Sequence, residues 1–248
     1  MNSIPRDPSV KAVWELDVET GEWTQHDATL NAVFAASTFV PATEQIITFH
    51  NQSNHDVFAF AYDADGTETV LGQVRHPDGS ALIRASDAFT NPETGESYVV
   101  MAGGGISRGG ISRIEIQGDS VVAERVLKFP SVEELGTSFA FGQAGYAFRP
   151  EDGKFYIWNG GEKIVSWDPD SGDVELLWNE GPGEAPPATA GANGLTFQKW
   201  AYLEEQDVFT GVVDGEVFVW RPGDNPDNLD MAQVGEVNVD FQTTGSLG

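Results

Sequence analysis

Residues 148–161 read Phe-Arg-Pro-Glu-Asp-Gly-Lys-Phe-Tyr-Ile-Trp-Asn-Gly-Gly, and residues 163–177 read Lys-Ile-Val-Ser-Trp-Asp-Pro-Asp-Ser-Gly-Asp-Val-Glu-Leu-Leu. Short runs of β-branched and aromatic residues alternate here with turns that contain Asp and Gly, a pattern that predicts strands joined by hairpins. The phrase recurs along the chain with variations. A hairpin pair cannot bury its apolar face alone, so successive copies are expected to stack on one another.

Four copies of the first strand align on an aromatic anchor that follows a small residue. The anchors are Phe39, Phe89, Phe148 and Tyr202. They recur at intervals of roughly 50 to 60 residues, which is within the range of propeller blades. A third strand with its turn has five copies, which begin at Val13, Val57, Ser112, Ile164 and Val217. The sequence therefore predicts an all-β chain.

The clearest copy places a double glycine after one strand and Asp-Pro-Asp-Ser-Gly-Asp after the next, at residues 155–161 and 168–173. This pattern resembles the Kelch and galactose-oxidase-like β-propeller families. The resemblance extends over most of the chain and implies four-stranded antiparallel blades, but it carries no catalytic residue with it. The Cys-crosslinked Tyr that galactose oxidase uses at its copper is excluded, because the chain has no Cys.

The chain ends suggest a blade count. Strands are expected at Val13–Leu16 and Glu22–Gln25, and a last one at residues 236–241. A C-terminal strand that completes the N-terminal blade would close the ring and remove exposed sheet edges. We therefore expect a single propeller domain over residues 1–248 with five blades, closed by pairing of the N- and C-terminal strands. The alternative is a fragment of a six- or seven-bladed propeller.

One short helix is expected within this β pattern. Val132–Leu135 can form a helical turn, with Ser131 as its N-terminal cap. No stretch of a dozen residues shows a sustained helical period.

The composition is strongly acidic, with a formal net charge of −26. Such a charge repels nucleic-acid phosphates and anionic membrane surfaces, and the acidic residues occur in nearly every turn. A saline environment fits this pattern, because salt shortens the reach of self-repulsion. Simple solubility is the alternative. The N-terminal residues lack the apolar core of a signal peptide, and no run approaches the ~20 apolar residues of a membrane-spanning helix. The cellular compartment therefore stays open.

Two acidic runs have the alternating spacing of calcium loops. They comprise Asp63, Asp65 and Glu68, and Asp168, Asp170 and Asp173. An EF-hand loop needs a longer run that ends in a bidentate Glu, and turn chemistry alone calls for Asp and Gly at such positions. We favour turn chemistry and expect no cofactor, with calcium as the alternative.

Candidate ligand-binding residues lie on the first strands and the loops that lead into them. Propellers place ligands at the mouth of the central channel, and planar donors with aromatic rings suit a sugar or a carboxylate-bearing polymer. The residues chosen on this basis are Arg84, Asp87, Tyr146, Lys199 and Trp200. Packing within the blades is the alternative explanation for them.

His50 and His55 form a His-x4-His spacing among Asn and Asp residues, between two expected strands. This spacing could bind a metal or supply a general base. A solvated hairpin loop is the favoured interpretation, and His50 is kept as a possible ligand-binding residue.

Two classes of function fit these observations. The first is a monomeric, non-catalytic propeller that binds a glycan or a protein partner through loops on one face. The second is a carbohydrate-active enzyme, either a polysaccharide lyase or a glycoside hydrolase, at the channel mouth. The sequence contains isolated candidates and no catalytic constellation, which favours the binding module.

The acidic composition generates a first prediction. We expect the melting temperature to rise clearly between low salt and molar NaCl, because screening relieves repulsion among the carboxylates. Thermal unfolding followed by circular dichroism measures this. A flat response would contradict the saline interpretation.

Overall fold

The protein was analysed as a computed structural model, which describes residues 12–16, 22–27, 35–51, 56–82, 84–101, 109–161, 163–179, 200–213, 216–222 and 230–236. The chain divides into two compact units, Met1–Phe129 and Pro130–Gly248. Each unit is described by itself, and a single domain over the whole chain stays a prediction.

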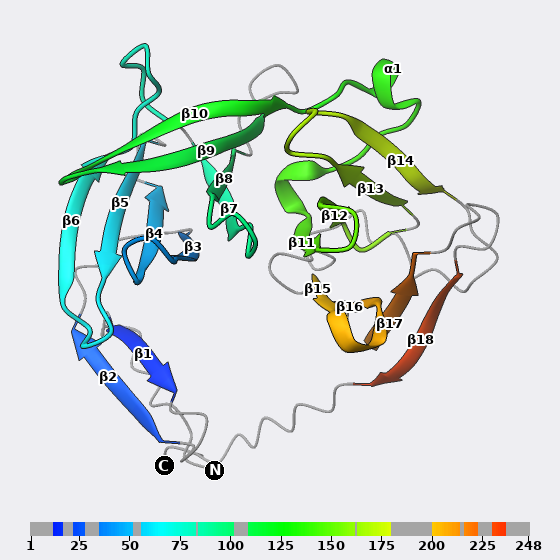
Figure 1. Cartoon of the computed structure of the whole chain (residues 1–248), viewed down its shortest axis with the longest axis horizontal. Helices are drawn as coiled ribbons and strands as arrows, with labels where there is room; N and C mark the ends of the chain where they lie inside the picture. The colour runs from blue at the N-terminus through cyan, green and yellow to red at the C-terminus, as the bar shows by residue number, and fades with distance from the viewer. Residues whose placement is uncertain are drawn as a thin grey trace, which may run out of the picture. The chain divides into compact units, whose positions relative to one another are not determined.

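The first unit contains one two-stranded sheet and two four-stranded sheets. The two-stranded sheet pairs β1 (Ala12–Leu16) with β2 (Trp23–Asp27). Blade A comprises β3 (Ala35–Val40), β4 (Gln45–Asn51), β5 (Val57–Tyr62) and β6 (Glu68–Gln73). Blade B comprises β7 (Ala85–Thr90), β8 (Ser97–Met101), β9 (Gly110–Gln117) and β10 (Ser120–Lys128). In Figure 1 these strands run from blue to green.

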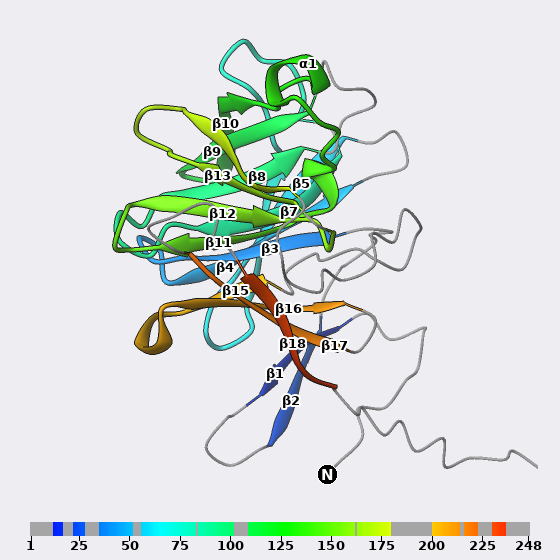
Figure 2. The same ribbon diagram turned by 90° about the vertical axis from the view of Figure 1, so that its right-hand side faces the viewer.

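The described residues of the second unit form two further four-stranded sheets and three short helices. Blade C comprises β11 (Gly145–Arg149), β12 (Lys154–Trp158), β13 (Lys163–Trp167) and β14 (Val174–Asn179). Blade D comprises β15 (Trp200–Leu203), β16 (Val208–Val213), β17 (Glu216–Arg221) and β18 (Asp230–Glu236). The helices are α1 (Val132–Leu135), η1 (Phe141–Gln143) and η2 (Glu204–Gln206). Figure 2 shows the strands of both units from a second direction.

The structure confirms an all-β propeller built of antiparallel four-stranded sheets. In each blade the strands follow one another in chain order, and every neighbouring pair is antiparallel. The predicted count of five blades is wrong, because the described residues form four blades.

The fifth copy of the repeat explains the miscount. Its two strands, β1 and β2, pair only with each other among the described residues. The final strand begins at Asp230, six residues before the predicted start at Glu236, and it pairs with β17 as the fourth strand of blade D. Among the described residues, β18 therefore does not pair with β1 in the predicted ring closure. The remainder of the predicted last strand, residues 237–241, lies outside the described residues.

In the first unit, blades A and B stack through aliphatic side chains. Alternate residues of each strand point to opposite faces, and one face of each blade contributes to a common buried cluster. Its members from blade A include Ile47, Phe49 and Ala61, and those from blade B include Val99 and Met101. Small residues in this cluster allow the two sheets to approach closely.

Main-chain contacts at the outer edge connect the same two blades. Just after β6, the Arg75 amide donates to the Val121 carbonyl oxygen (3.3 Å), and the Ala123 amide donates to the Arg75 carbonyl oxygen (2.8 Å). Arg75 thus forms a parallel bridge to Val122 of β10. This bridge fixes the outer edge of blade A against blade B.

In the second unit, blades C and D stack through aromatic rings. Trp158 of β12 lies 4.9 Å from Trp200 of β15 between ring centroids, and Trp200 stacks on Phe209 at 5.2 Å. Tyr156 contacts Phe209 and Trp220. Aromatic pairs at these separations add to the stabilisation that comes from burial.

An ion pair connects the end of β11 with the turn between β15 and β16 in the second unit. Arg149, at the end of β11, donates from Nε and Nη2 to the two carboxylate oxygens of Asp207 at 3.0 and 3.1 Å. The Tyr202 hydroxyl also donates to Asp207. These bonds hold the pKa of Asp207 below its ordinary value, with the Arg149 contact as the largest cause. The bidentate ion pair therefore joins the end of β11 to the turn between β15 and β16.

Two local predictions from the sequence are confirmed. Ser131 caps α1, because its hydroxyl accepts a hydrogen bond from the Glu134 amide while the Glu134 carboxylate accepts one from the Ser131 amide. Turn chemistry accounts for Asp168, whose Oδ1 accepts hydrogen bonds from the amides of Asp170 (2.8 Å) and Ser171 (3.2 Å).

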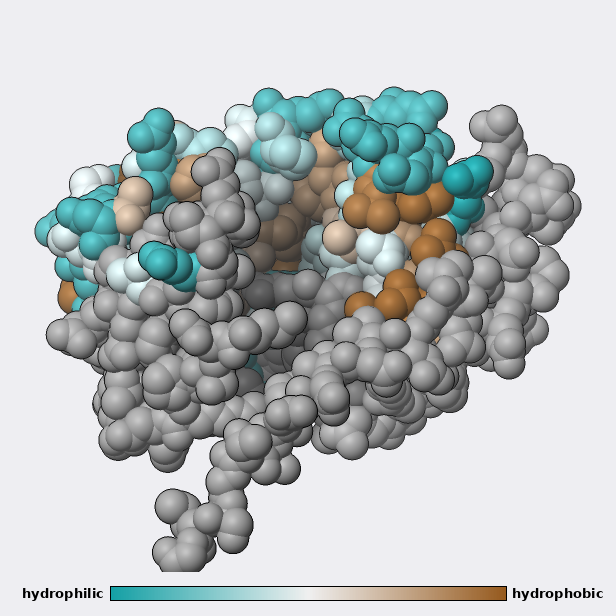
Figure 3. Space-filling model, turned by 90° about the horizontal axis from the view of Figure 1, so that it is seen from below, coloured by the Kyte–Doolittle hydropathy of each residue, from teal (hydrophilic) through white to brown (hydrophobic). Residues whose placement is uncertain are grey.

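Hydrophilic side chains are prominent on the surface. In the view of Figure 3, teal hydrophilic residues line the upper edge of the described surface, and brown hydrophobic residues lie beneath them. Within the described ranges, none of the helices has the length and apolar character needed to cross a lipid bilayer.

The aromatic stack generates a second prediction. A Cβ atom added to Gly211 would lie 2.1 Å from Cζ3 of Trp158 and 2.9 Å from Trp200. Both rings are buried on several sides and cannot move aside. Gly211→Ala is therefore expected to destabilise the protein by about 1–3 kcal/mol, the usual cost of overpacking. Chemical denaturation measures this.

The matched control is Thr210→Ala, the adjacent position on β16, whose side chain is only half-buried. Equal stability of Gly211→Ala and the wild type would contradict the packing described for blades C and D.

Candidate functional site

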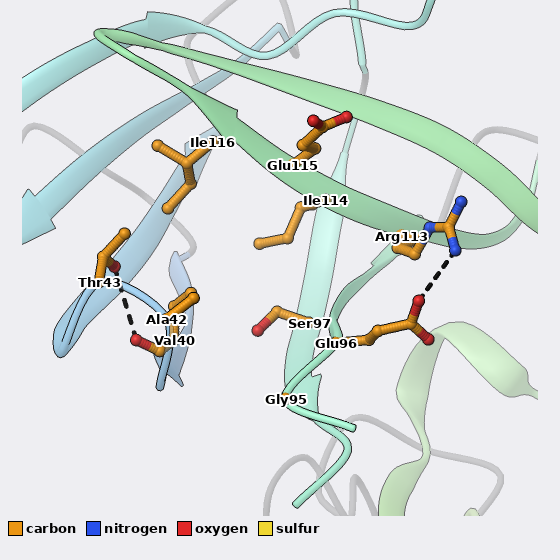
Figure 4. A pocket seen from close by; sticks show the side chains of 10 residues that line it. All are labelled: Val40, Ala42, Thr43, Gly95, Glu96, Ser97, Arg113, Ile114, Glu115 and Ile116. Atoms are coloured by element: carbon orange, nitrogen blue, oxygen red, sulfur yellow. Dashed lines mark hydrogen bonds and ion pairs between the residues drawn. The ribbon is translucent and has the colours of Figure 1, made fainter. Parts of the chain in front are cut away.

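A pocket of about 420 Å³ lies between blades A and B of the first unit. Its lining residues come from the hairpin after β3, the turn before β8, and β9. They are Val40, Ala42, Thr43, Gly95, Glu96, Ser97, Arg113, Ile114, Glu115 and Ile116. Figure 4 shows these side chains. The volume falls within the range of about 300–1,000 Å³ typical of small-molecule sites.

The apolar wall of the pocket follows from strand periodicity. Ile114 and Ile116 are two residues apart on β9, so they point to the same side of the strand. In Figure 4 they extend toward Val40 and the β3–β4 hairpin. The hairpin turn carries the small residue Ala42, which leaves space between the two blades.

A hydroxyl network includes one of the pocket-lining residues, Ser97. The Thr90 hydroxyl donates to the Phe39 carbonyl oxygen at 2.6 Å, and its oxygen lies 2.8 Å from that of Thr38 and 2.7 Å from that of Ser97. A hydroxyl has one proton to donate, so Thr38 and Ser97 are the donors to Thr90. The Ser97 oxygen, in a residue that is 3% exposed, therefore keeps acceptor capacity.

The rim of the pocket carries a charge pair. Arg113 donates to Glu96 and to Glu124, each at 2.9 Å, and the Tyr98 hydroxyl donates to Glu96 at 2.8 Å. The Tyr98 hydrogen bond is the largest cause that lowers the pKa of Glu96, and Arg113 adds to it. Glu96 is consequently an ionised acceptor at neutral pH, and the charge of Arg113 is shared between two carboxylates.

The residues predicted from sequence in the first unit lie outside this pocket lining. Arg84 is exposed, directly before β7, with a positive φ of 57°. Asp87 lies on β7 and is buried, and its Oδ1 accepts a hydrogen bond from the Ala88 amide at 2.8 Å. Their role in ligand binding stays a prediction.

Two of the predicted residues in the second unit, Tyr146 and Trp200, are buried. Tyr146 is buried on β11 and donates its hydroxyl hydrogen to the Phe141 carbonyl oxygen at 2.9 Å. Trp200 is 3% exposed, and its Nε1 donates to the Tyr156 carbonyl oxygen at 3.0 Å. These contacts favour the packing alternative for both residues. Lys199 lies outside the described residues.

The interpretation of His50 as part of a solvated loop is wrong. His50 lies on β4, its side chain is 1% exposed, and its ring packs 4.6 Å from that of Phe60. Neither ring nitrogen has a hydrogen-bond partner. Burial lowers its pKa, and the charge of Glu68 opposes this effect. The strand continues two residues beyond its predicted end at Phe49, and His55 lies outside the described residues.

Metal ligands are not gathered in the part of the chain that the structure describes. It contains no group of three or more His, Cys, Asp or Glu side chains arranged to hold a metal ion. The pocket lining itself has hydroxyl, carboxylate and guanidinium groups as its polar functions.

Sequence reasoning missed the pocket because its lining residues come from three separate segments of the chain. These are residues 40–43, 95–97 and 113–116. The alternation of Ile114 and Ile116 was a visible signal of a shared strand face. No sequence signal identified Ser97, whose position depends on its contact with Thr90.

Comparisons with known proteins support the fold. The chain matches no protein-family model, and no curated protein matches it. Solved structures do match. One is a putative 6-phosphogluconolactonase from Bacteroides uniformis, with 15% identity over 93% of this chain and 64% of that chain, and a TM-score of 0.50.

Two other solved structures are similar. The allergen Mala s 1 of Malassezia sympodialis has 13% identity, covers 91% of this chain and 72% of that chain, and has a TM-score of 0.55. An auxiliary nutrient-binding protein from Bacteroides ovatus has 12% identity, covers 90% and 48%, and has a TM-score of 0.52. The chain spans less than two thirds of the first and third of these structures. At such identities the similarity concerns the fold alone, and the Kelch resemblance stays a prediction.

The buried histidine generates a third prediction. Because the folded state binds fewer protons at His50 than the unfolded chain does, the free energy of unfolding should fall as the pH drops below about 6.5. We expect the loss of stability between pH 7.5 and pH 5.5 to be smaller in His50→Leu than in the wild type. Urea denaturation across this pH range measures the difference.

His76→Leu is the matched control, because His76 is half-buried and its Nδ1 lies 2.8 Å from the Ala123 carbonyl oxygen. Parallel pH profiles for the wild type and His50→Leu would contradict the prediction.

Proposed function

We propose that the protein is a non-catalytic binding propeller that recognises a neutral glycan through the pocket between blades A and B. The observation that carries this proposal is the combination of an aliphatic wall, Ile114 and Ile116, with the acceptor oxygens of Ser97 and Glu96. A sugar ring presents apolar C–H groups and hydroxyl donors, which match these two surfaces. The few polar groups would orient the ring within a mainly apolar cavity.

The charges favour a neutral ligand over an acidic one. Arg113 already contacts Glu96 and Glu124, so its guanidinium is poorly placed to neutralise a uronate. The net charge of −26 further opposes the approach of an anionic polysaccharide. Sugar hydroxyls can donate to carboxylates without carrying a charge of their own.

The chemistry at the rim favours binding over catalysis. A general acid in a glycoside hydrolase needs a raised carboxyl pKa, whereas the pKa of Glu96 is lowered. A lyase needs an Arg that faces the substrate carboxylate and a nearby base, and the contacts of Arg113 work against this role. The carbohydrate-active enzyme is therefore the less favoured alternative.

The structural comparisons do not choose between these alternatives. They include both a nutrient-binding protein and a putative lactonase, at identities of 12% and 15%. A propeller can carry many unrelated functions. The proposal therefore rests on the pocket residues.

The fourth prediction tests the pocket. A glycan array should identify neutral oligosaccharides that bind, and isothermal titration should then measure their affinity. Ala42→Phe places a ring in the pocket and should weaken binding by about tenfold or more, because the ligand and the ring compete for the same volume.

The matched control is Ala64→Phe, at an exposed position in the neighbouring hairpin of blade A, outside the pocket lining. It should bind as the wild type does. Equal binding by Ala42→Phe would contradict the assignment of the pocket. Turnover of a glycan, seen as an unsaturated product in the ultraviolet or as new reducing ends, would contradict the non-catalytic role.

A further inference from the structure

A second surface of the first unit has the properties of a protein-docking site. On the face of blade A that points away from blade B, cross-strand pairing aligns Phe39 with Ile46, and Phe60 with Val70. Phe39, Ile46 and Val70 are 52%, 46% and 56% exposed. We call this surface the Phe39 face, defined by its exposed side chains Phe39, Ile46 and Val70. Phe60 and Tyr62 lie in the same rows but are buried, at 9% and 3% exposed.

Strand periodicity explains why these residues share a face. Ile46 also pairs with Tyr62, and Tyr62 with Glu68, so one row crosses all four strands. The residues between them on each strand, such as Ile47 and Ala61, belong to the buried cluster with blade B. Blade A is thus apolar on both faces, and one of them is partly open.

The grouping distinguishes this surface from ordinary scattered apolar residues. Single exposed hydrophobic side chains are normal on proteins, whereas contiguous ones mark interaction sites. Five large hydrophobic residues are exposed in the described part of the chain, and three of them lie on the Phe39 face. The other two, Val132 and Leu203, belong to the second unit.

The charge around this face is of one sign. Between Ala12 and Val74 the sequence contains ten acidic residues and neither Lys nor Arg. Glu68 lies in the same row as Phe39 and Ile46 and accepts a hydrogen bond from the Tyr62 hydroxyl at 2.6 Å. Asp63 accepts a hydrogen bond from Gln45 at 2.8 Å, next to Ile46. Carboxylates therefore border the apolar residues.

We propose that the Phe39 face binds a basic polypeptide segment with alternating apolar and cationic side chains. Apolar side chains of the segment would pack on Phe39 and Ile46, and its Lys or Arg side chains would lie near Glu68 and Asp63. A second copy of this chain, itself highly acidic, is disfavoured by like charge. This site and its ligand are independent of the glycan pocket.

The fifth prediction tests this proposal by fluorescence polarisation. The probe is a fluorescein-labelled hexapeptide of alternating leucine and lysine. Two control peptides replace leucine by serine or lysine by glutamate. The leucine–lysine peptide should bind more tightly than either control, and NaCl should weaken its binding because the charges are screened. Equal binding by the serine–lysine peptide would mean that charge alone attracts it, and would overturn the proposal.

Variants locate the peptide on the protein. Phe39→Ser and Ile46→Thr keep the net charge and should each weaken binding by about tenfold, as the loss of an apolar anchor commonly does. Leu203→Ser is the matched control, because Leu203 is 43% exposed in the second unit, and it should bind as the wild type does. Unchanged binding by both Phe39→Ser and Ile46→Thr would overturn the proposal.

Two measurements on the wild type keep the test decisive if a variant fails to fold. Bound peptide should shift the amide resonances of β3 and β4 in nuclear magnetic resonance spectra, and shifts confined to other strands would overturn the proposal. Sedimentation should show no dimer. A wild-type dimer that Phe39→Ser abolishes would identify a second copy as the occupant instead.

Discussion

The structure depends on the face-to-face stacking of neighbouring four-stranded sheets. A sheet with apolar side chains on both faces cannot be stable alone, and each blade gains its burial from the blade beside it. The closest contact in the second unit shows how strict this requirement is, because Trp158 occupies the space that a side chain at position 211 would need. In the first unit, small and aliphatic residues fill the same role between blades A and B.

Polar contacts then fix how the stacked sheets are aligned. Arg149 and Asp207 join the end of β11 to the turn between β15 and β16 in the second unit, and the hydroxyls of Thr38 and Thr90 join β3 and β7 in the first. Thr90 also contacts Ser97, which lines the candidate pocket. The Phe39 face does not meet the same stacking requirement completely, because apolar side chains on this face of blade A remain exposed.

Much of the fold could be predicted from sequence, because strand and turn signals are local. The aromatic anchors, the acidic turns and the cap at Ser131 depend on neighbouring residues, and each was identified. The blade count, in contrast, depends on pairing between strands that are far apart in the sequence. The hairpin at β1 and β2 has the same local pattern as strands in complete blades, so the sequence could not show that these strands pair only with each other among the described residues.

The candidate site was harder to predict for a related reason. Tyr146 and Trp200 have the chemistry of ligand-binding residues, but their hydrogen-bond partners, Phe141 and Tyr156, are main-chain carbonyl groups inside the fold. His50 resembles a loop residue until β4 is seen to extend to Asn51. Conversely, Ser97 donates to Thr90 because the Thr90 proton is directed to the Phe39 carbonyl oxygen, and this hydrogen-bond pattern can be recognised only from the geometry.

The most direct test of the proposed binding site is a crystal structure of the protein with a bound neutral oligosaccharide. We expect a sugar ring between the β3–β4 hairpin and β9, with its hydroxyl groups facing Ser97 and Glu96. A ring bound elsewhere, for example beside Arg84 and Asp87, with the pocket between blades A and B left without sugar, would contradict the proposed function.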